Sequence, residues 1–297
     1  MAAVSAEDNK LFCFGLGYTA CRLAEVLIGE GWRIAGTTRD HDKGAELQWA
    51  GIDTCITHGD GFESNLATVL RGSRYVLVSV PPQDDGDLVT LHHGGDISAL
   101  PGLRWLGYLS STAVYGDHGG AWVDEATPPV PSSEIGSRRL VAEESWLALW
   151  RERGIPVHVF RLSGIYGPGR SALDRVRAGT ARRIVKSGHV LSRIHVDDIT
   201  SVLVASMARP RPGAIYNLSD DQPASAAEVT AFAAKLLSAK PPPEISYNAS
   251  EISPEAGRFF VDHRRVRNNL IKTELGVLLR YPNYEMGLRA IAAGDIC

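Results

Sequence analysis

Near its start, the 297-residue chain reads LFCFGLGYTA from Leu11 to Ala20. The apolar residues before the glycines predict a β-strand, and the residues from Tyr18 to Ile28 predict a helix. Gly15, Gly17 and Ala20 stand between the strand and the helix body with the spacing G-x-G-x-x-A. In this pattern the first glycine permits a tight turn, the second lets backbone approach a pyrophosphate, and the small third residue lets the helix pack on the strand.

The strand-turn-helix context turns this glycine pattern into a prediction of dinucleotide binding. The N-terminus of the helix would supply N–H donors and a favourable dipole to the phosphates. An ordinary βα turn is the alternative interpretation. The predicted cofactor-binding residues of this loop are Gly15, Gly17, Tyr18, Thr19 and Ala20.

Short apolar runs alternate with helix-sized segments after this loop. Predicted strands are 32–37, 52–56, 75–80, 105–110 and 157–162, and predicted helices include 18–28 and 43–50. Parallel strands need crossover connections of this length, so the fold class is α/β, with a Rossmann-like doubly wound parallel sheet. Ser225 and Glu228 form a capping-box pattern that predicts a helix to about Leu237.

The end of the second predicted strand bears on the choice of cofactor. NAD-binding chains place an acidic residue about 20 residues past the glycine loop. Here that place reads Thr37-Thr38-Arg39, and the first acid is Asp40. Because Arg39 can bind a 2′-phosphate bidentately and Thr38 can donate to it, we expect NADP rather than NAD. A solvated turn arginine is the alternative.

Composition excludes several other classes of protein. The net charge of −3 gives no electrostatic footprint for nucleic acid, and no apolar run is long enough to span a membrane. The cysteines Cys13, Cys21, Cys55 and Cys297 have no metal-ligand spacing, so we expect no metal site. The polar start from Met1 to Lys10 does not resemble a signal peptide, and a cytoplasmic location is expected.

Three further motifs follow in order along the chain. They read LSSTAVYGD from Leu109, RLSGIYGPG from Arg161 and IHVDDI from Ile194. Together with the glycine loop, they resemble the extended short-chain dehydrogenase/reductases, the NAD(P)-dependent epimerase/dehydratase family. The resemblance implies a seven-stranded sheet in residues 1–163, with interleaved later segments at about 190–237, and a small C-terminal α/β substrate domain in residues 164–297.

The resemblance also implies catalytic positions. Ser111 matches the family's catalytic serine or threonine, although a strand-end serine that satisfies backbone is an equal alternative. The family's Tyr-x-x-x-Lys pair falls on Ile135 and Arg139, and Asp87 falls near its asparagine position. Isoleucine cannot transfer a proton and arginine does not titrate as lysine does, so the chain looks like an atypical member.

Other side chains are candidates to take over these roles. Tyr115 and Tyr166 carry hydroxyls, although packing is the more common role of such residues. Arg170 and Arg193 are candidates to hold a substrate anion, and Asp198 is expected to cap a helix. The predicted border of the nicotinamide ribose is formed by Val80, Pro81 and Pro82.

These observations predict an NADP(H)-dependent oxidoreductase, epimerase or dehydratase that acts on a small molecule with a carbonyl or hydroxyl group, including a nucleotide-sugar. The alternative is a non-catalytic NADP(H)-binding redox sensor, which the missing tyrosine and lysine favour. A small-molecule substrate and a homodimer are the expected partners.

Overall fold

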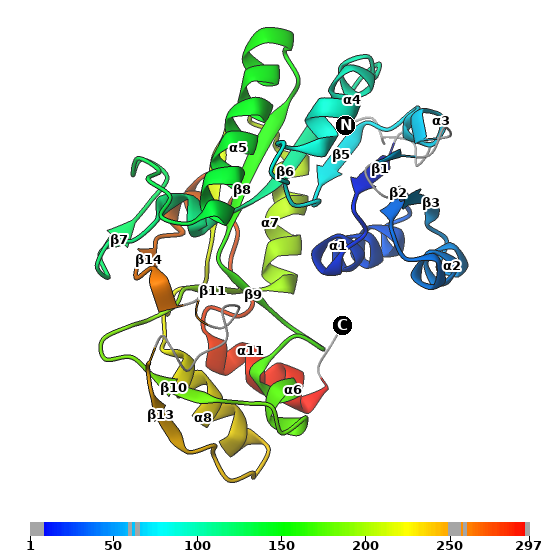
Figure 1. Ribbon diagram of the computed structural model, residues 1–297. Coiled ribbons are helices and arrows are strands. Elements are labelled where there is room, and N and C mark those ends of the chain that lie inside the picture. Colours follow the sequence, from blue (N-terminus) through cyan, green and yellow to red (C-terminus); the bar gives the residue numbers. More distant parts are fainter. Residues whose placement is uncertain (1–8, 59–60, 63–65, 249–256, 258–259, 295–297) are drawn as a thin grey trace. The chain divides into compact units, whose positions relative to one another are not determined.

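The computed structural model describes residues 9–58, 61–62, 66–248, 257 and 260–294. Its largest element is a mostly parallel sheet in the order β12-β8-β6-β5-β1-β2-β3-β4 (Figure 1). The last strand, β4, pairs antiparallel with β3, and the other seven strands form the main sheet, the number that the family resemblance implies. The strands are β1 (Lys10–Phe14), β2 (Arg33–Thr38), β3 (Asp53–His58), β4 (Gly61–Phe62), β5 (Tyr75–Val78), β6 (Trp105–Ser111), β8 (Val157–Leu162) and β12 (Ile215–Leu218).

The described helices either connect the parallel strands of this sheet, as its right-handed crossovers require, or lie in other parts of the chain. They are α1 (Tyr18–Gly29), α2 (His41–Trp49), α3 (Leu66–Leu70), α4 (Leu88–Ser98), α5 (Glu134–Arg153), α6 (Ala172–Arg177), α7 (Val196–Ala208), α8 (Ala226–Leu236), α10 (Asn269–Thr273) and α11 (Tyr284–Ala293), with the 3-10 helix η2 (Thr112–Tyr115). The predicted Rossmann-like α/β class is therefore confirmed. The predicted capping box at Ser225 and Glu228 is present at the start of α8.

Three small parallel pairs complete the described structure, and the sequence analysis predicts none of them. They join β7 (Trp122–Val123) to β14 (Arg265–Val266), β9 (Gly164–Tyr166) to β11 (Arg193–His195), and β10 (Arg183–Val185) to β13 (Glu244–Ser246). Each strand has two or three residues, which is too short for a periodic sequence pattern.

The chain divides into two compact units, each built from three segments. One comprises residues 1–110, 138–160 and 203–215, and the other comprises 111–137, 161–202 and 216–297. The division into a cofactor part, 1–163, and a substrate part, 164–297, concerns function and stays a prediction.

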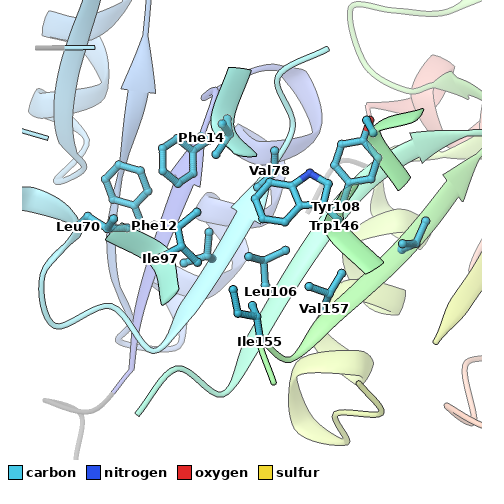
Figure 2. Packing of buried hydrophobic residues seen from close by; sticks show 14 of the residues in the cluster. Phe12, Phe14, Leu70, Val78, Ile97, Leu106, Tyr108, Trp146, Ile155 and Val157 are labelled. Atoms are coloured by element: carbon cyan, nitrogen blue, oxygen red, sulfur yellow. The ribbon is translucent and has the colours of Figure 1, made fainter. Parts of the chain in front are cut away.

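One apolar cluster in the core of the first unit is shown in Figure 2. Phe12 and Phe14 of β1 lie beside Val76 and Val78 of β5, and Trp146 of α5 stacks on Tyr108 of β6 at 6.3 Å between ring centroids (Figure 2). Each fully buried side chain of this size contributes about 1.5–3 kcal/mol. The second unit has its own cluster around Leu173, with members from α6, α8 and α11.

Within the described ranges, no helix has the length and apolar character needed to cross a membrane. The same residues contain no group of three or more histidine, cysteine, aspartate or glutamate side chains arranged to hold a metal ion.

Candidate functional site

The glycine loop after β1 is fastened to the end of β2. The Gly15 N–H donates to Thr37 Oγ1 at 2.9 Å, and the Leu16 N–H donates to the Thr37 carbonyl at 2.7 Å. Gly15 has a φ of 88°, and a Cβ there would lie 3.0 Å from atoms of both Ser79 and Val80. Glycine is therefore required at this position, both for the backbone conformation and for the close approach.

Gly17 occupies the N-cap position of α1. Because glycine has no side chain, no side-chain hydrogen bond caps this helix. The first turn of the helix has no acidic residue, and an added Cβ at Gly17 would meet nothing within 4 Å. Thr19 and Ala20 are buried beneath this turn, whereas Tyr18 is half-buried. A helix start with no side-chain cap, no acidic residue and open space beside Gly17 fits the pyrophosphate of a dinucleotide.

The side chains at the end of β2 and just after it differ in whether they already form hydrogen bonds within the protein. Asp40 Oδ1 accepts the N–H groups of Asp42 at 3.0 Å and Lys43 at 3.1 Å, and so caps α2. Thr38 Oγ1 accepts the Asp40 N–H at 3.3 Å. Arg39 is exposed, and its guanidinium has no partner among the described residues. The nearest carboxylate is thus held by a helix, while the arginine remains able to bind an anion.

The first residue after β5, Ser79, contacts the glycine loop. Ser79 Oγ donates to the Gly15 carbonyl at 2.5 Å. Val80 and Pro82 are half-buried and Pro81 is exposed. The strand ends at Val78, two residues earlier than the predicted Val80. Val80, Pro81 and Pro82 therefore form a loop, and their contact with a cofactor stays a prediction.

Arg139 and Asp87 both form bonds within the first unit. The Arg139 guanidinium donates to the Leu109 carbonyl at 2.7 Å and to the Tyr108 hydroxyl at 3.2 Å. Asp87 caps α4 by accepting the Thr90 N–H at 2.9 Å, and burial raises the pKa of its carboxyl, with hydrogen bonds and Arg139 opposing the rise. Ile135, which has the place of the family's tyrosine, is 44% exposed.

Ser111 ends β6 and begins the second unit. Its Oγ accepts the Ala113 N–H at 3.1 Å, which caps the 3-10 helix η2. A serine hydroxyl that accepts one bond keeps its O–H for donation. The side chain is half-buried. Ser111 therefore has the structural role considered above and still has a donor available for a ligand.

Tyr115 belongs to a buried polar network. Its hydroxyl donates to Asn217 Oδ1 at 2.8 Å and accepts from Arg161 at 3.0 Å, while Arg161 also lies 4.9 Å from the ring centroid. Glu125 accepts the Asn217 N–H at 2.8 Å. Burial raises the pKa of the Tyr115 hydroxyl, with Arg161 opposing the rise. The hydroxyl is occupied on both its donor and its acceptor side.

Sequence reasoning missed Arg161, Asn217 and Glu125. One signal was available, because Arg161 interrupts the otherwise buried strand VHVFRL. A charge in such a strand must be paired, since burying an unpaired charge costs many kcal/mol. The partners themselves come from distant segments and leave no local pattern.

Tyr166 is held between β9 and α11. A Cβ added at Gly287 would lie 2.2 Å from the Tyr166 hydroxyl oxygen, so only glycine lets the ring approach α11. The hydroxyl donates weakly to the Asn283 carbonyl at 3.4 Å. Burial raises the pKa of the hydroxyl far above its ordinary value. Tyr166 therefore has a packing role in this structure.

The two arginines predicted to hold a substrate anion differ in their surroundings. Arg170 is exposed next to the Gly-Pro-Gly turn. Arg193 is half-buried and donates to the carbonyls of Leu191 at 2.8 Å and Ala224 at 2.7 Å. Its guanidinium ties β11 to the start of the segment that leads into α8.

The expectation that Asp198 caps a helix is wrong. Asp198 lies inside α7, and its carboxylate accepts the N–H groups of Arg280 at 2.7 Å and Tyr281 at 3.1 Å. It therefore anchors a remote loop within the second unit. Burial raises the pKa of this carboxyl to about 6.

The model of the NAD dependent epimerase/dehydratase family matches residues 98–219. A conserved protein of unknown function from Silicibacter pomeroyi DSS is similar over nearly its whole length, with 45% identity, a TM-score of 0.89, and coverage of 96% of this chain and 99% of that one. The chain belongs to the NAD dependent epimerase/dehydratase family.

Two further similarities are more distant. Protein YeeZ of Escherichia coli K12 is 27% identical over 285 residues, which cover 93% of this chain and 97% of YeeZ. A UDP-glucuronic acid 4-epimerase from Bacillus cereus, solved in complex with UDP-glucuronic acid and NAD, is 16% identical with a TM-score of 0.77 and coverage of 96% and 98%. At that identity the likeness shows the fold.

Proposed function

We propose that this protein is an NADP(H)-dependent enzyme that acts on a small molecule with a carbonyl or hydroxyl group, a nucleotide-sugar being one candidate. The preference for NADP(H) rests on the different surroundings of Arg39 and Asp40, the two residues that follow β2. Asp40 is engaged by α2, and Arg39 is exposed with no partner among the described residues. A free carboxylate would repel a 2′-phosphate, whereas a free guanidinium attracts it.

The residues of the glycine loop would hold the pyrophosphate through the N–H groups around Gly17 and the start of α1. The nicotinamide, when bound, supplies or accepts a hydride. Ser111 would donate its O–H to the substrate oxygen, because its acceptor side is already used by η2. A donor aimed at developing negative charge lowers the barrier to hydride transfer without itself giving up a proton.

The cofactor preference is tested by fluorescence titration of NADPH and NADH. We expect Arg39→Ala to weaken NADPH binding by about 1.5–3 kcal/mol, the scale of a charged hydrogen bond, and to leave NADH binding nearly unchanged. Arg104→Ala is the matched control, since Arg104 is also exposed in the first unit but lies before β6. Equal losses for both cofactors would remove Arg39 from the phosphate site.

A second candidate function is a redox sensor that binds NADP(H) without catalysis. It is favoured by the engagement of Arg139, Tyr115 and Tyr166 in internal bonds. None of these three groups is placed as a spare proton donor. The absorbance of NADPH with a panel of nucleotide-sugars and simple carbonyl compounds distinguishes turnover from binding alone.

Ser111→Ala then separates the two functions at one residue. For an enzyme, we expect turnover to fall by about 10²–10⁴ while NADPH affinity changes little. For a sensor, the same substitution shifts NADPH binding slightly and has no further effect. A variant that keeps full turnover would show that the reacting oxygen is bound elsewhere. Ser145→Ala is a suitable control, because Ser145 is half-buried on α5 and its hydroxyl donates to the Val141 carbonyl at 3.0 Å.

A further inference from the structure

The second unit contains an open cavity between α8 and the small β10–β13 sheet. Figure 1 shows this two-stranded sheet beside α8. The cavity has a volume of about 490 Å³, within the usual range for small-molecule sites. None of the predicted cofactor, catalytic or substrate residues lines it. Its walls are formed by Arg183, Val185, Ser225, Ala227, Glu228, Ala231, Phe232, Lys235, Glu244 and Tyr284.

One wall is a stripe along α8. Ala227, Ala231 and Lys235 are four residues apart, so they share one face of the helix, and Phe232 lies beside them. The Phe232 ring packs edge to face against Tyr284 at 5.6 Å, and Arg289 lies 5.1 Å from its centroid. The aromatic ring is therefore held in place, and the two alanines leave room above the helix.

The acidic groups of the cavity are already engaged by the protein. Glu228 Oε2 accepts the Ser225 N–H at 2.9 Å as part of the capping box of α8. Glu244 accepts from the Arg183 guanidinium at 2.8 Å across the β10–β13 pair. Both carboxylates are thus bound to groups that they stabilise.

The donors that remain are cationic. The Arg183 Nε–H is buried and has no hydrogen-bond partner among the described residues. Lys235 is exposed, and its ammonium bonds to nothing in the described parts of the chain. A buried donor without a partner is unfavourable, so an acceptor that reaches Arg183 would be stabilised.

We propose that this cavity binds a small monocarboxylic acid with an apolar body. The carboxylate would accept from Arg183 Nε and Lys235, and the apolar body would cover Ala231 and Phe232. A monoanion fits better than a phosphate, because Glu228 and Glu244 stand at the same cavity and repel higher negative charge.

The proposal is tested by titrating 3-phenylpropionate into the ¹⁵N-labelled full-length protein and following amide chemical shifts. We expect saturable shifts at Ala231 and Phe232. The uncharged 3-phenylpropionamide should bind about tenfold more weakly, and inorganic phosphate should not bind at this site. Equal binding of acid and amide, or the largest shifts away from the lining residues, would overturn the proposal.

Variants locate the two ends of the ligand. Arg183→Lys keeps the positive charge but removes the Nε–H, and we expect about a tenfold loss of affinity for the acid. Lys235→Gln should cost about threefold, because its ammonium is solvated. Ala231→Trp should abolish binding by filling the space over Phe232, with circular dichroism checking the fold.

Lys240→Gln is the matched control, since Lys240 is exposed just beyond α8 and does not line the cavity. We expect it to leave the affinity unchanged. If Lys240→Gln and Lys235→Gln weaken binding equally, the acid is responding to the general charge of this surface, and the assigned site is wrong. The assigned site is also wrong if neither Arg183→Lys nor Lys235→Gln weakens binding of the acid more than binding of the amide.

Discussion

Two sets of polar groups in this molecule differ in what they are bonded to. At the glycine loop, no side chain caps α1, and the Arg39 guanidinium has no partner among the described residues. At the positions expected to carry catalysis or to hold a substrate anion, Arg139, Tyr115 and Arg193 are engaged with backbone carbonyls or other side chains. The first set is arranged to receive a ligand, and the second mainly holds the fold together.

This difference shows why a residue type at a family position is weak evidence of function. Arg139 has the place of the family's lysine, yet its guanidinium joins α5 to the end of β6. A guanidinium has several donors in a rigid fork, so it can hold two acceptors at once where an ammonium would be less specific. In this structure Arg139 therefore supports β6, the strand that ends at Ser111.

The largest expected effect is at Arg193. Replacing it with methionine removes a half-buried cation that holds two carbonyls and lies near the buried Asp220. We expect the free energy of unfolding to fall by about 3–5 kcal/mol in urea denaturation. Arg182→Met, an exposed control, should change stability by less than about 0.5 kcal/mol. A stable Arg193→Met protein would place Arg193 among the groups available to ligand.

The next effect is a dependence of stability on pH through His158. Its Nδ1–H donates to the Leu106 carbonyl at 3.3 Å, and its Nε2 accepts the Arg211 N–H at 2.8 Å. Burial lowers the pKa of this imidazole to about 4. Between the unfolded pKa of 6.5 and this value, the unfolded chain binds more protons, so stability falls as the pH falls.

The size of this effect is about 3 kcal/mol between pH 7 and pH 4. His158→Gln can form both bonds and does not titrate, so its stability should lack this component. The measurement is urea unfolding of both proteins across that pH range. A constant difference between them would mean that His158 titrates normally and that its two bonds do not fix its neutral form.

The smallest expected effect is a change in NADPH affinity when Asp40, the neighbour of Arg39, is replaced. Asparagine caps helices as well as aspartate does, so Asp40→Asn should keep α2 intact while removing a negative charge beside Arg39. We expect NADPH affinity to rise by about two- to fivefold at low salt and less at high salt. NADH affinity should stay constant. A loss of NADPH affinity would show that the Asp40 carboxylate orients Arg39, contrary to the separation of roles described above.

The sequence predicts six strands of the main sheet because each of them carries its own signal, whereas β12 and the two-residue β4 are not predicted. The apolar runs around Phe12, Val76 and Val159 are buried on both sides and are bounded by turn residues, so local patterns suffice. The glycine loop is predicted equally well, since the positive φ and the close contacts at Gly15 require glycine. The strand ends differ from the predicted ones by one or two residues.

The engagement of side chains could not be predicted in the same way. Arg193 donates to Ala224, 31 residues away, and Asp198 accepts from Arg280, 82 residues away. Such partners are brought together by tertiary folding and leave no periodic signal. The cavity beside α8 is similar, because its empty space depends on Ala227 and Ala231 lying opposite a two-stranded sheet of three-residue strands.

The missing side-chain cap at Gly17 has a consequence for the lifetime of the protein. Under the proposed function, the first N–H groups of α1 are completed by water in the free protein and by phosphate in the bound form. Binding then raises the free energy of unfolding by RT ln(1 + [L]/Kd), which is about 2.7 kcal/mol at one hundred times Kd. The rate at which proteases degrade this chain therefore follows the supply of cofactor, and depletion of the cofactor pool would shorten the time for which the protein persists.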